Sequence, residues 1–107
     1  MSRKFKAYPS AFTGQRPHYS TLEKGEVATY RVDWNGVINE LSTSASSSAW
    51  ATDQSCISTA SAALSSGVAS ITVTASEVGE AILSDQLTMA DGSKREQKFA
   101  VCVIDTR

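Results

Sequence analysis

The chain has 107 residues, of which 41% are hydrophobic and 20% charged, and its formal net charge is -1. This length accommodates one domain with a single core and excludes most multidomain enzyme architectures. The nearly balanced charge provides no overall attraction to nucleic acid or to a membrane surface, and we expect neither as a partner. Few glycines and prolines, with many Ser, Thr and Ala residues, indicate a small all-β domain.

The charges are unevenly distributed along the chain. Arg3, Lys4, Lys6 and Arg16 precede Glu23, the first acidic residue, whereas residues 26–91 contain eight acidic residues and a single basic one. This asymmetry predicts a basic N-terminal segment followed by an acidic body. No apolar run approaches the length of a membrane span or a signal-peptide core, so we expect the protein to be made and folded in a cytoplasm.

Residues 1–25 are predicted to form an extended N-terminal arm. They show no sustained period of either kind, and Pro9, Gly14 and Pro17 prevent a helix of useful length. The aromatic rings of this segment need a surface to bury against, either the body or a neighbouring subunit, and a frayed terminus is the alternative. The residues predicted to contact a partner are Arg3, Lys4, Phe5, Lys6, Tyr8, Phe12, Arg16, His18 and Tyr19.

Residues 27–34 are the first clear strand, since polar and apolar side chains alternate up to Trp34. Asn35-Gly36 ends this strand, and a longer connection follows. We expect that connection to cover the end of the core with its apolar side chains, which are Val37, Ile38 and Leu41.

The middle of the chain carries weaker signals. A short exposed strand over residues 47–52 is predicted to deliver Trp50 into the core. Residues 55–65 are predicted as weak strands, with a helix over 58–64 as the alternative. Residues 68–75 form a stronger strand in which Ile71 and Val73 face inward.

The best-defined element is a β-hairpin over residues 80–104. Its turn is Ala90-Asp91-Gly92-Ser93, because Asp-Gly readily accepts the backbone of a tight reversal. Asp85 interrupts the apolar face, and a buried carboxylate needs partners. We therefore expect a sheet end or a bulge that turns Asp85 toward solvent.

Short strands separated by frequent turns predict an antiparallel β-sandwich of about seven strands over residues 26–107, preceded by the arm. Its predicted core consists of Trp34, Trp50, Ile71, Val73, Leu83, Leu87, Phe99, Val101 and Val103.

Several segments, taken in their order and spacing, resemble a group of small tailed-phage virion proteins with an Ig-like or fibronectin-III-like sandwich. The resemblance covers roughly residues 27–104 and rests on Val32-Asp33-Trp34, Ser46-Ser47-Ser48-Ala49-Trp50, Ala69-Ser70-Ile71-Thr72-Val73, and Asp91-Gly92 with Glu96 and Phe99. Two loops depart from the group, because Thr74-Ala75-Ser76 and Asp53-Gln54 replace its usual Gly-Gly and Pro-Gly turns.

The resemblance implies a non-catalytic structural protein located in the virion of a tailed bacteriophage. We expect a capsid decoration or an accessory of the head-tail region, attached through its arm. The expected partners are other virion proteins, namely capsid, neck or tail subunits and further copies of the chain. The alternative is a recognition module that binds a cell-surface glycan or receptor.

Candidate catalytic groups are few, and we expect neither an enzyme nor a cofactor. His18 is the only histidine and is distant in sequence from Cys56 and Cys102, so no metal-ligand spacing or base-nucleophile pair is evident. We expect the two cysteines to be small buried or half-buried thiols, with a single disulfide as the alternative. The acidic residues near the hairpin are interpreted as a solvated rim, with an acid-base pair or a calcium site as alternatives.

Overall fold

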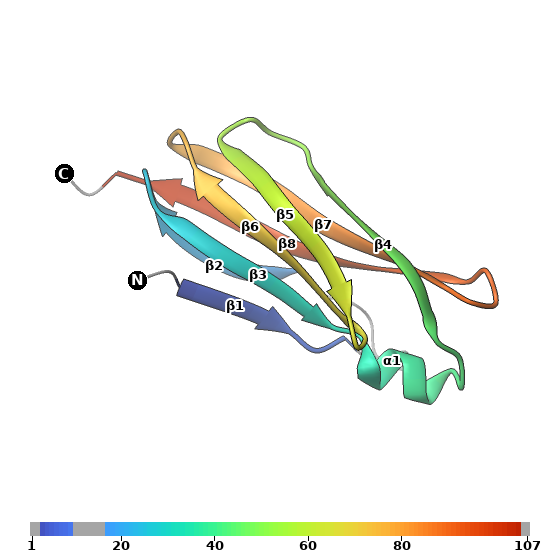
Figure 1. Cartoon of the computed structure of the whole chain (residues 1–107). Coiled ribbons are helices and arrows are strands. Elements are labelled where there is room, and N and C mark those ends of the chain that lie inside the picture. The colour runs from blue at the N-terminus through green and yellow to red at the C-terminus, as the bar shows by residue number, and fades with distance from the viewer. Residues whose placement is uncertain (1–2, 10–16, 106–107) are drawn as a thin grey trace.

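The computed structural model describes residues 3–9 and 17–105. Within them the chain forms strands that pack as two layers, with one short helix at one end (Figure 1). The elements are β1 (Arg3–Ala7), β2 (His18–Glu23), β3 (Val27–Asp33), α1 (Asn35–Glu40), β4 (Ala45–Thr52), β5 (Ile57–Ser65), β6 (Val68–Ala75), β7 (Gly79–Met89) and β8 (Lys94–Ile104). The all-β prediction is confirmed.

Each layer is a four-stranded sheet. The first sheet has the order β1-β3-β6-β5, and the second has the order β2-β8-β7-β4. All pairings among β3–β8 are antiparallel, as predicted, whereas β1 pairs parallel with β3 and β2 pairs parallel with β8. The sandwich is therefore mixed, because the N-terminal segment adds one parallel edge strand to each sheet.

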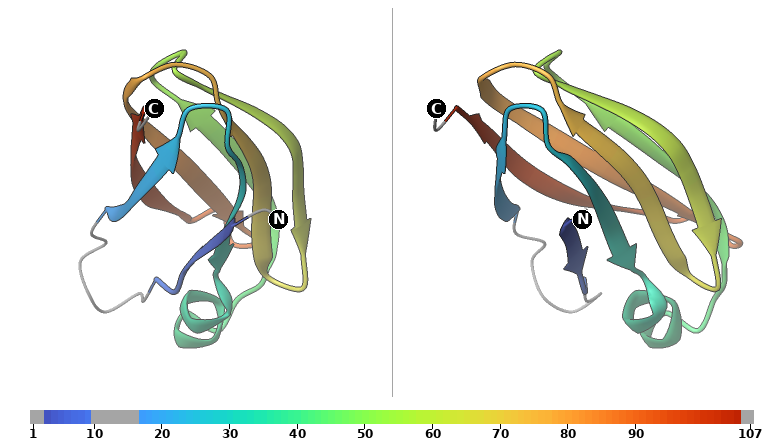
Figure 2. Two further views of the ribbon diagram at one scale, coloured as in Figure 1. Left: turned by 90° about the vertical axis from the view of Figure 1, so that its left-hand side faces the viewer. Right: turned by 60° about the vertical axis from the view of Figure 1, so that its left-hand side comes forward.

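Within the N-terminal segment, residues 3–7 and 18–23 belong to the two sheets and do not form a separate arm. Figure 2 shows β1 beside β3 and β2 beside β8, on different layers of the molecule. Ala7 and Leu22 are buried, and Phe5 packs partly buried against the core. The predicted arm differs from the structure because these strands are short and because their pairing partners lie far away along the chain.

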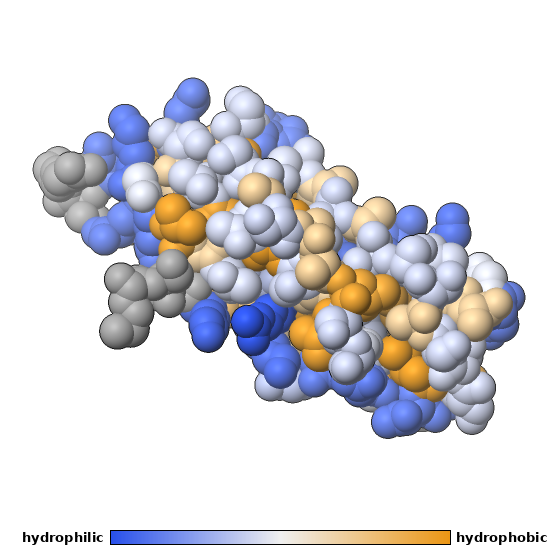
Figure 3. Space-filling view, in the orientation of Figure 1, coloured by the Kyte–Doolittle hydropathy of each residue, from blue (hydrophilic) through white to orange (hydrophobic). Residues whose placement is uncertain are grey.

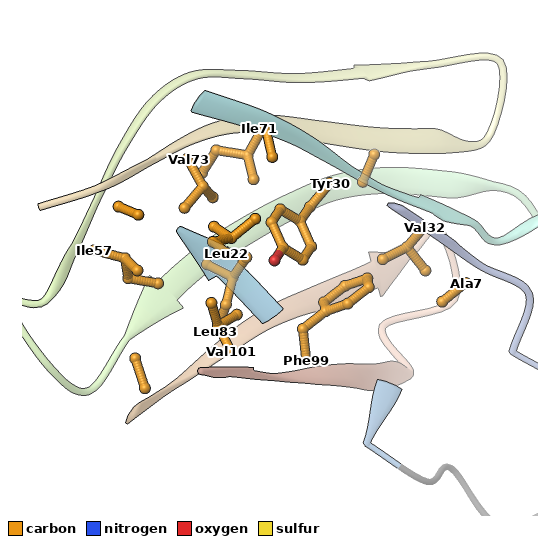
Figure 4. Packing of buried hydrophobic residues seen from close by; sticks show 14 of the residues in the cluster. Ala7, Leu22, Tyr30, Val32, Ile57, Ile71, Val73, Leu83, Phe99 and Val101 are labelled. Atoms are coloured by element: carbon orange, nitrogen blue, oxygen red, sulfur yellow. The ribbon is translucent and has the colours of Figure 1, made fainter. Parts of the chain in front are cut away.

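The core lies between the sheets and centres on aromatic rings from both layers (Figure 4). Tyr30 is fully buried, with its ring 4.9 Å from that of Phe5 and 5.0 Å from that of Phe99. Its hydroxyl lies 2.6 Å from the hydroxyl of Ser20, so the phenol keeps a hydrogen bond inside the core. The predicted core residues are all buried except Trp50, which is half-buried and stacks at 6.2 Å on Phe99. Tyr30 and Leu22 join them as residues that the prediction left out.

Strand β5 forms the other edge of the first sheet and β4 the other edge of the second sheet, and both are mostly exposed. Residues 41–76 contain one charged residue, Asp53, so their surface consists largely of Ser, Thr and Ala. The face seen in Figure 3 is accordingly pale over much of its centre. Register shifts at the start of β4 and in the middle of β5 break both edges, which opposes pairing with another chain.

Cys56 and Cys102 are free thiols, the first buried and the second half-buried, so the disulfide alternative is not realised. Within residues 3–9 and 17–105, no helix combines the length and the apolar character needed to cross a bilayer.

Candidate functional site

The residues predicted to bind a partner are divided between two edge strands. Phe5 and His18 face the interior, where the His18 ring lies 5.5 Å from that of Phe99. Lys6 lies 3.8 Å from Asp33 and 5.2 Å from the centre of the Tyr8 ring. The other exposed positions are Lys4, Tyr8 and Tyr19, Arg3 begins β1, and Phe12 and Arg16 lie outside the described residues. Among the described residues, the side chains of this set are therefore divided between the interior and two different strands, β1 and β2.

A different group of segments gathers at the end of the sandwich that carries α1, opposite the start of β1 and the end of β8 (Figure 1). We call it the loop end and define it as residues 35–44, the β5–β6 turn at 66–67 and the hairpin tip at 90–93. The first joint is between α1 and the β5–β6 turn. The Trp34 amide donates to the carbonyl of Gly67 at 2.9 Å, and the Asn35 carboxamide donates to the carbonyl of Ser66 at 3.1 Å.

The second joint connects the segment after α1 to the hairpin tip. The Ala90 amide donates to the carbonyl of Ser44 at 2.9 Å, next to the pairing of Ala45 with Met89. Within the tip, the Asp91 carboxylate accepts bonds from the amide and the hydroxyl of Ser93, at 3.0 and 2.5 Å. These bonds lower the pKa of Asp91, which therefore stays ionised and fixes the turn. The three segments of the loop end are thus held in one arrangement.

A buried polar contact lies beneath the loop end. The indole of Trp34 donates to Asp85 at 2.7 Å, and both side chains are fully buried. Burial raises the pKa of Asp85 to about 6, although the Trp34 hydrogen bond lowers it. The expectation that Asp85 turns toward solvent is therefore wrong. It sits within the regular β7–β8 pairing because Trp34, distant in sequence, supplies the donor.

The loop end carries small polar and backbone groups, and the opposite end is acidic. The exposed positions of the loop end are Asn35, Gly36, Asn39, Ser42, Ser44, Ser66, Ala90, Asp91 and Gly92. Among the described residues, the opposite end carries the exposed cation Lys24 and six acidic residues, which are Glu23, Glu26, Asp53, Glu77, Glu80 and Asp105. Ser, Gly and Asn are typical of adaptable protein-binding loops, and such groups are desolvated at low cost compared with carboxylates. The loop end is therefore the better candidate for contact with another protein.

Gly67 is the position on which the first joint depends. Its φ is +77°, and a Cβ there would lie 2.9 Å from the Cγ of Asn35 and still closer to the carboxamide oxygen. Gly92 has a φ of +89° with no atom within 4 Å of such a Cβ, so it is a matched control.

We expect Gly92→Ala to cost about 1–2 kcal/mol of unfolding free energy through its backbone alone. Gly67→Ala should cost at least about 1 kcal/mol more, because the Asn35 side chain must also move. Urea denaturation of both variants measures the difference. Equal losses would contradict a close contact between Gly67 and Asn35.

The described residues contain no group of three His, Cys, Asp or Glu side chains arranged to hold a metal ion. His18 lies on β2 beside Phe99, and Cys56 lies in the turn before β5, so they do not form a base-nucleophile pair. The arrangement of the loop end supports binding and offers no catalytic group.

No known protein-family model matches the sequence, and no curated protein matches it either. Solved structures share the fold over nearly the whole chain. The cysteine protease inhibitor EhICP2 from Entamoeba histolytica is 9% identical, with 94% of this chain and 97% of that chain covered and a TM-score of 0.53. Amebosin is 16% identical, with 94% and 98% covered and a TM-score of 0.54. PbICP-C, solved in complex with falcipain-2, is 9% identical, with 96% and 100% covered and a TM-score of 0.58.

These findings overturn the predicted virion function and the predicted virion partners. The structures that share the fold include a cysteine protease inhibitor and a protein bound to falcipain-2, and none of the three is described as a phage protein. Two of them are binding proteins by description, in line with a non-enzyme. At such identities the likeness establishes the fold.

Proposed function

We propose that the protein is a non-catalytic inhibitor of cysteine proteases, and that its loop end is the surface that enters the active-site cleft. The whole-length likeness to EhICP2, a cysteine protease inhibitor, and to PbICP-C, solved with falcipain-2, supports this class of function. Residues 3–9 and 17–105 contain no group of three His, Cys, Asp or Glu side chains arranged to hold a metal ion, which is compatible with it.

The observation that carries the proposal is that hydrogen bonds hold the three separate segments of the loop end together. Hydrogen bonds from Trp34 to Gly67, from Asn35 to Ser66 and from Ala90 to Ser44 hold these segments before any partner arrives. A preorganised surface loses little conformational entropy on binding, so more of its contact energy appears as affinity. The molecule is also elongated, with extents of 48 × 25 × 23 Å, and the loop end lies at one end of it (Figure 1).

The exposed groups of the loop end are of a kind that can enter the active-site cleft of a protease at low desolvation cost. They are mainly amides, hydroxyls and backbone, which form hydrogen bonds readily, and only Asp91 is an exposed charge among residues 90–93. An acidic surface entering a cleft leaves carboxylates desolvated unless each finds a cationic partner. The opposite end, with its six acidic residues, is less suited to this role.

The test is inhibition of falcipain-2 and papain, measured from the hydrolysis of a fluorogenic peptide, with trypsin as the negative control. We expect inhibition constants below about 10 μM for at least one cysteine protease. Asn39→Arg and Ala90→Arg place large side chains on exposed positions of the loop end, and each should raise the inhibition constant at least about tenfold.

Gln54→Arg is the matched control for Asn39→Arg, because Gln54 is an exposed amide near the opposite end. It should leave inhibition unchanged. Failure to inhibit either cysteine protease would overturn the proposed function. If Asn39→Arg and Gln54→Arg changed the inhibition constant equally, the inhibitory surface would not be the loop end.

A further inference from the structure

A second surface, independent of the loop end, lies on the outer face of the second sheet. Along β8 the outward side chains Ala100 and Cys102 are small, and each stands between larger neighbours. Ala100 pairs with Tyr19 on β2 and with Ile82 on β7, and Cys102 pairs with Thr21 and Glu80. Two small residues between taller rows form a groove that runs along β8.

The groove is the main part of a hollow of about 580 Å³. Its lining on the outer face is completed by Asp53 and Gln54 from the β4–β5 connection. The Asp53 carboxylate accepts a bond from the Ile82 amide at 2.8 Å, which fixes this connection to the rim. The remaining lining residues belong to inward-facing rows and are Phe5, Ser20, Ala81 and Val101.

The chemistry of the groove is that of a site for a cation with an aliphatic stem. The floor is apolar and half-buried, one wall is the ring of Tyr19, which is 78% exposed, and the rim carries the carboxylates of Asp53 and Glu80. None of the lining residues is cationic. The next outward cation along β8, Lys98, lies 3.9 Å from Glu96.

An anionic ligand would be repelled by the two carboxylates, and a purely apolar ligand would desolvate them without replacing their hydrogen bonds. A guanidinium or ammonium group avoids both costs. It can pair with a carboxylate, and the face of a tyrosine ring attracts it as well.

We propose that this groove binds an extended segment of a partner protein through an Arg or Lys side chain. The aliphatic stem of that side chain lies on Ala100 and Cys102 between Tyr19 and Ile82, and its charged group meets Glu80 and Asp53 at the rim. The site lies away from the loop end, so it does not depend on the proposed inhibitor function.

The test uses the full-length protein, labelled with ¹⁵N, and the peptide acetyl-glycyl-arginyl-glycine amide as the probe. We expect amide shifts that saturate and that are confined to residues around Tyr19, Ile82, Ala100 and Cys102. Glu80→Gln, an exposed isosteric change, should weaken binding of the peptide about fivefold. A rise in salt concentration should also weaken it, because salt screens the attraction between exposed charges. Ala100→Leu should fill the floor and abolish the shifts.

Two controls test whether binding requires the groove and the positive charge of the peptide. Glu77→Gln removes an exposed acid at the same end of the molecule that does not line the groove, and it should leave the affinity unchanged. The peptide with glutamine in place of arginine should bind at least about fivefold more weakly. Equal binding of both peptides, shifts outside the groove, or equal effects of Glu77→Gln and Glu80→Gln would overturn the proposal.

Discussion

Replacing Trp34 by Ala should lower the free energy of unfolding by about 3–5 kcal/mol, a large part of the stability of a domain of this size. The indole is fully buried, so its removal leaves a cavity. It also removes the donor that bonds to Asp85 at 2.7 Å and leaves a buried carboxylate without that partner. Urea denaturation followed by far-ultraviolet circular dichroism measures the loss.

Trp50→Ala is the matched control, because it removes the same side chain from a half-buried position. The Trp50 indole N–H has no hydrogen-bond partner among the described residues, so its removal breaks no polar contact there. We expect a loss of about 1–2 kcal/mol. Equal losses for the two variants, or a loss below about 2 kcal/mol for Trp34→Ala, would contradict the central position assigned to Trp34.

Replacing Asp85 by Asn should stabilise the protein at neutral pH and have little effect in acid. The folded-state pKa of Asp85 is raised to about 6 from an ordinary value of 3.8. The protonated Asp85 side chain is therefore the form that the folded state favours. Its contribution to the unfolding free energy is fully present below pH 3.8 and is lost as the pH rises through about 6. The shift corresponds to about 3 kcal/mol, which is the largest gain expected from replacing the ionised carboxylate by a neutral amide.

The measurement is the difference in unfolding free energy between wild type and Asp85→Asn at pH 4 and at pH 7.5. Asparagine retains an acceptor oxygen for the Trp34 indole, so packing changes little. The difference should grow with pH, because only the wild type has to ionise this buried group. A difference that is the same at both pH values would show that Asp85 is not held in an environment that disfavours its charge.

Trp34→Ala, which removes the indole that bonds to Asp85, also tests how the loop end is supported. Trp34 lies directly before α1, and its amide bonds to Gly67 while its indole bonds to Asp85 in β7. One residue thus connects the α1 joint to the hairpin through the core. A protein that keeps its fold but loses this link should keep the groove on the second sheet and lose the arrangement of the loop end.

Local sequence determined the antiparallel body of this protein. Strong alternation predicted residues 68–75, which form β6, and the Asp91-Gly92 turn predicted the β7–β8 hairpin. These elements are specified by side-chain period and turn chemistry between neighbouring segments, which a single sequence displays directly. The inward rows of the hairpin followed from the same period.

Only the tertiary structure decided the rest. Residues 3–7 and 18–23 carry short and partly polar alternations, and they become strands because β3 and β8 offer them free edges. Asp85 is tolerated inside because Trp34 reaches it from 51 positions away. The loop end is assembled by bonds between segments that are separated in sequence. The groove on the second sheet likewise depends on which residues of three strands stand side by side. Such pairings are set by contacts across the fold, and no local pattern contains them.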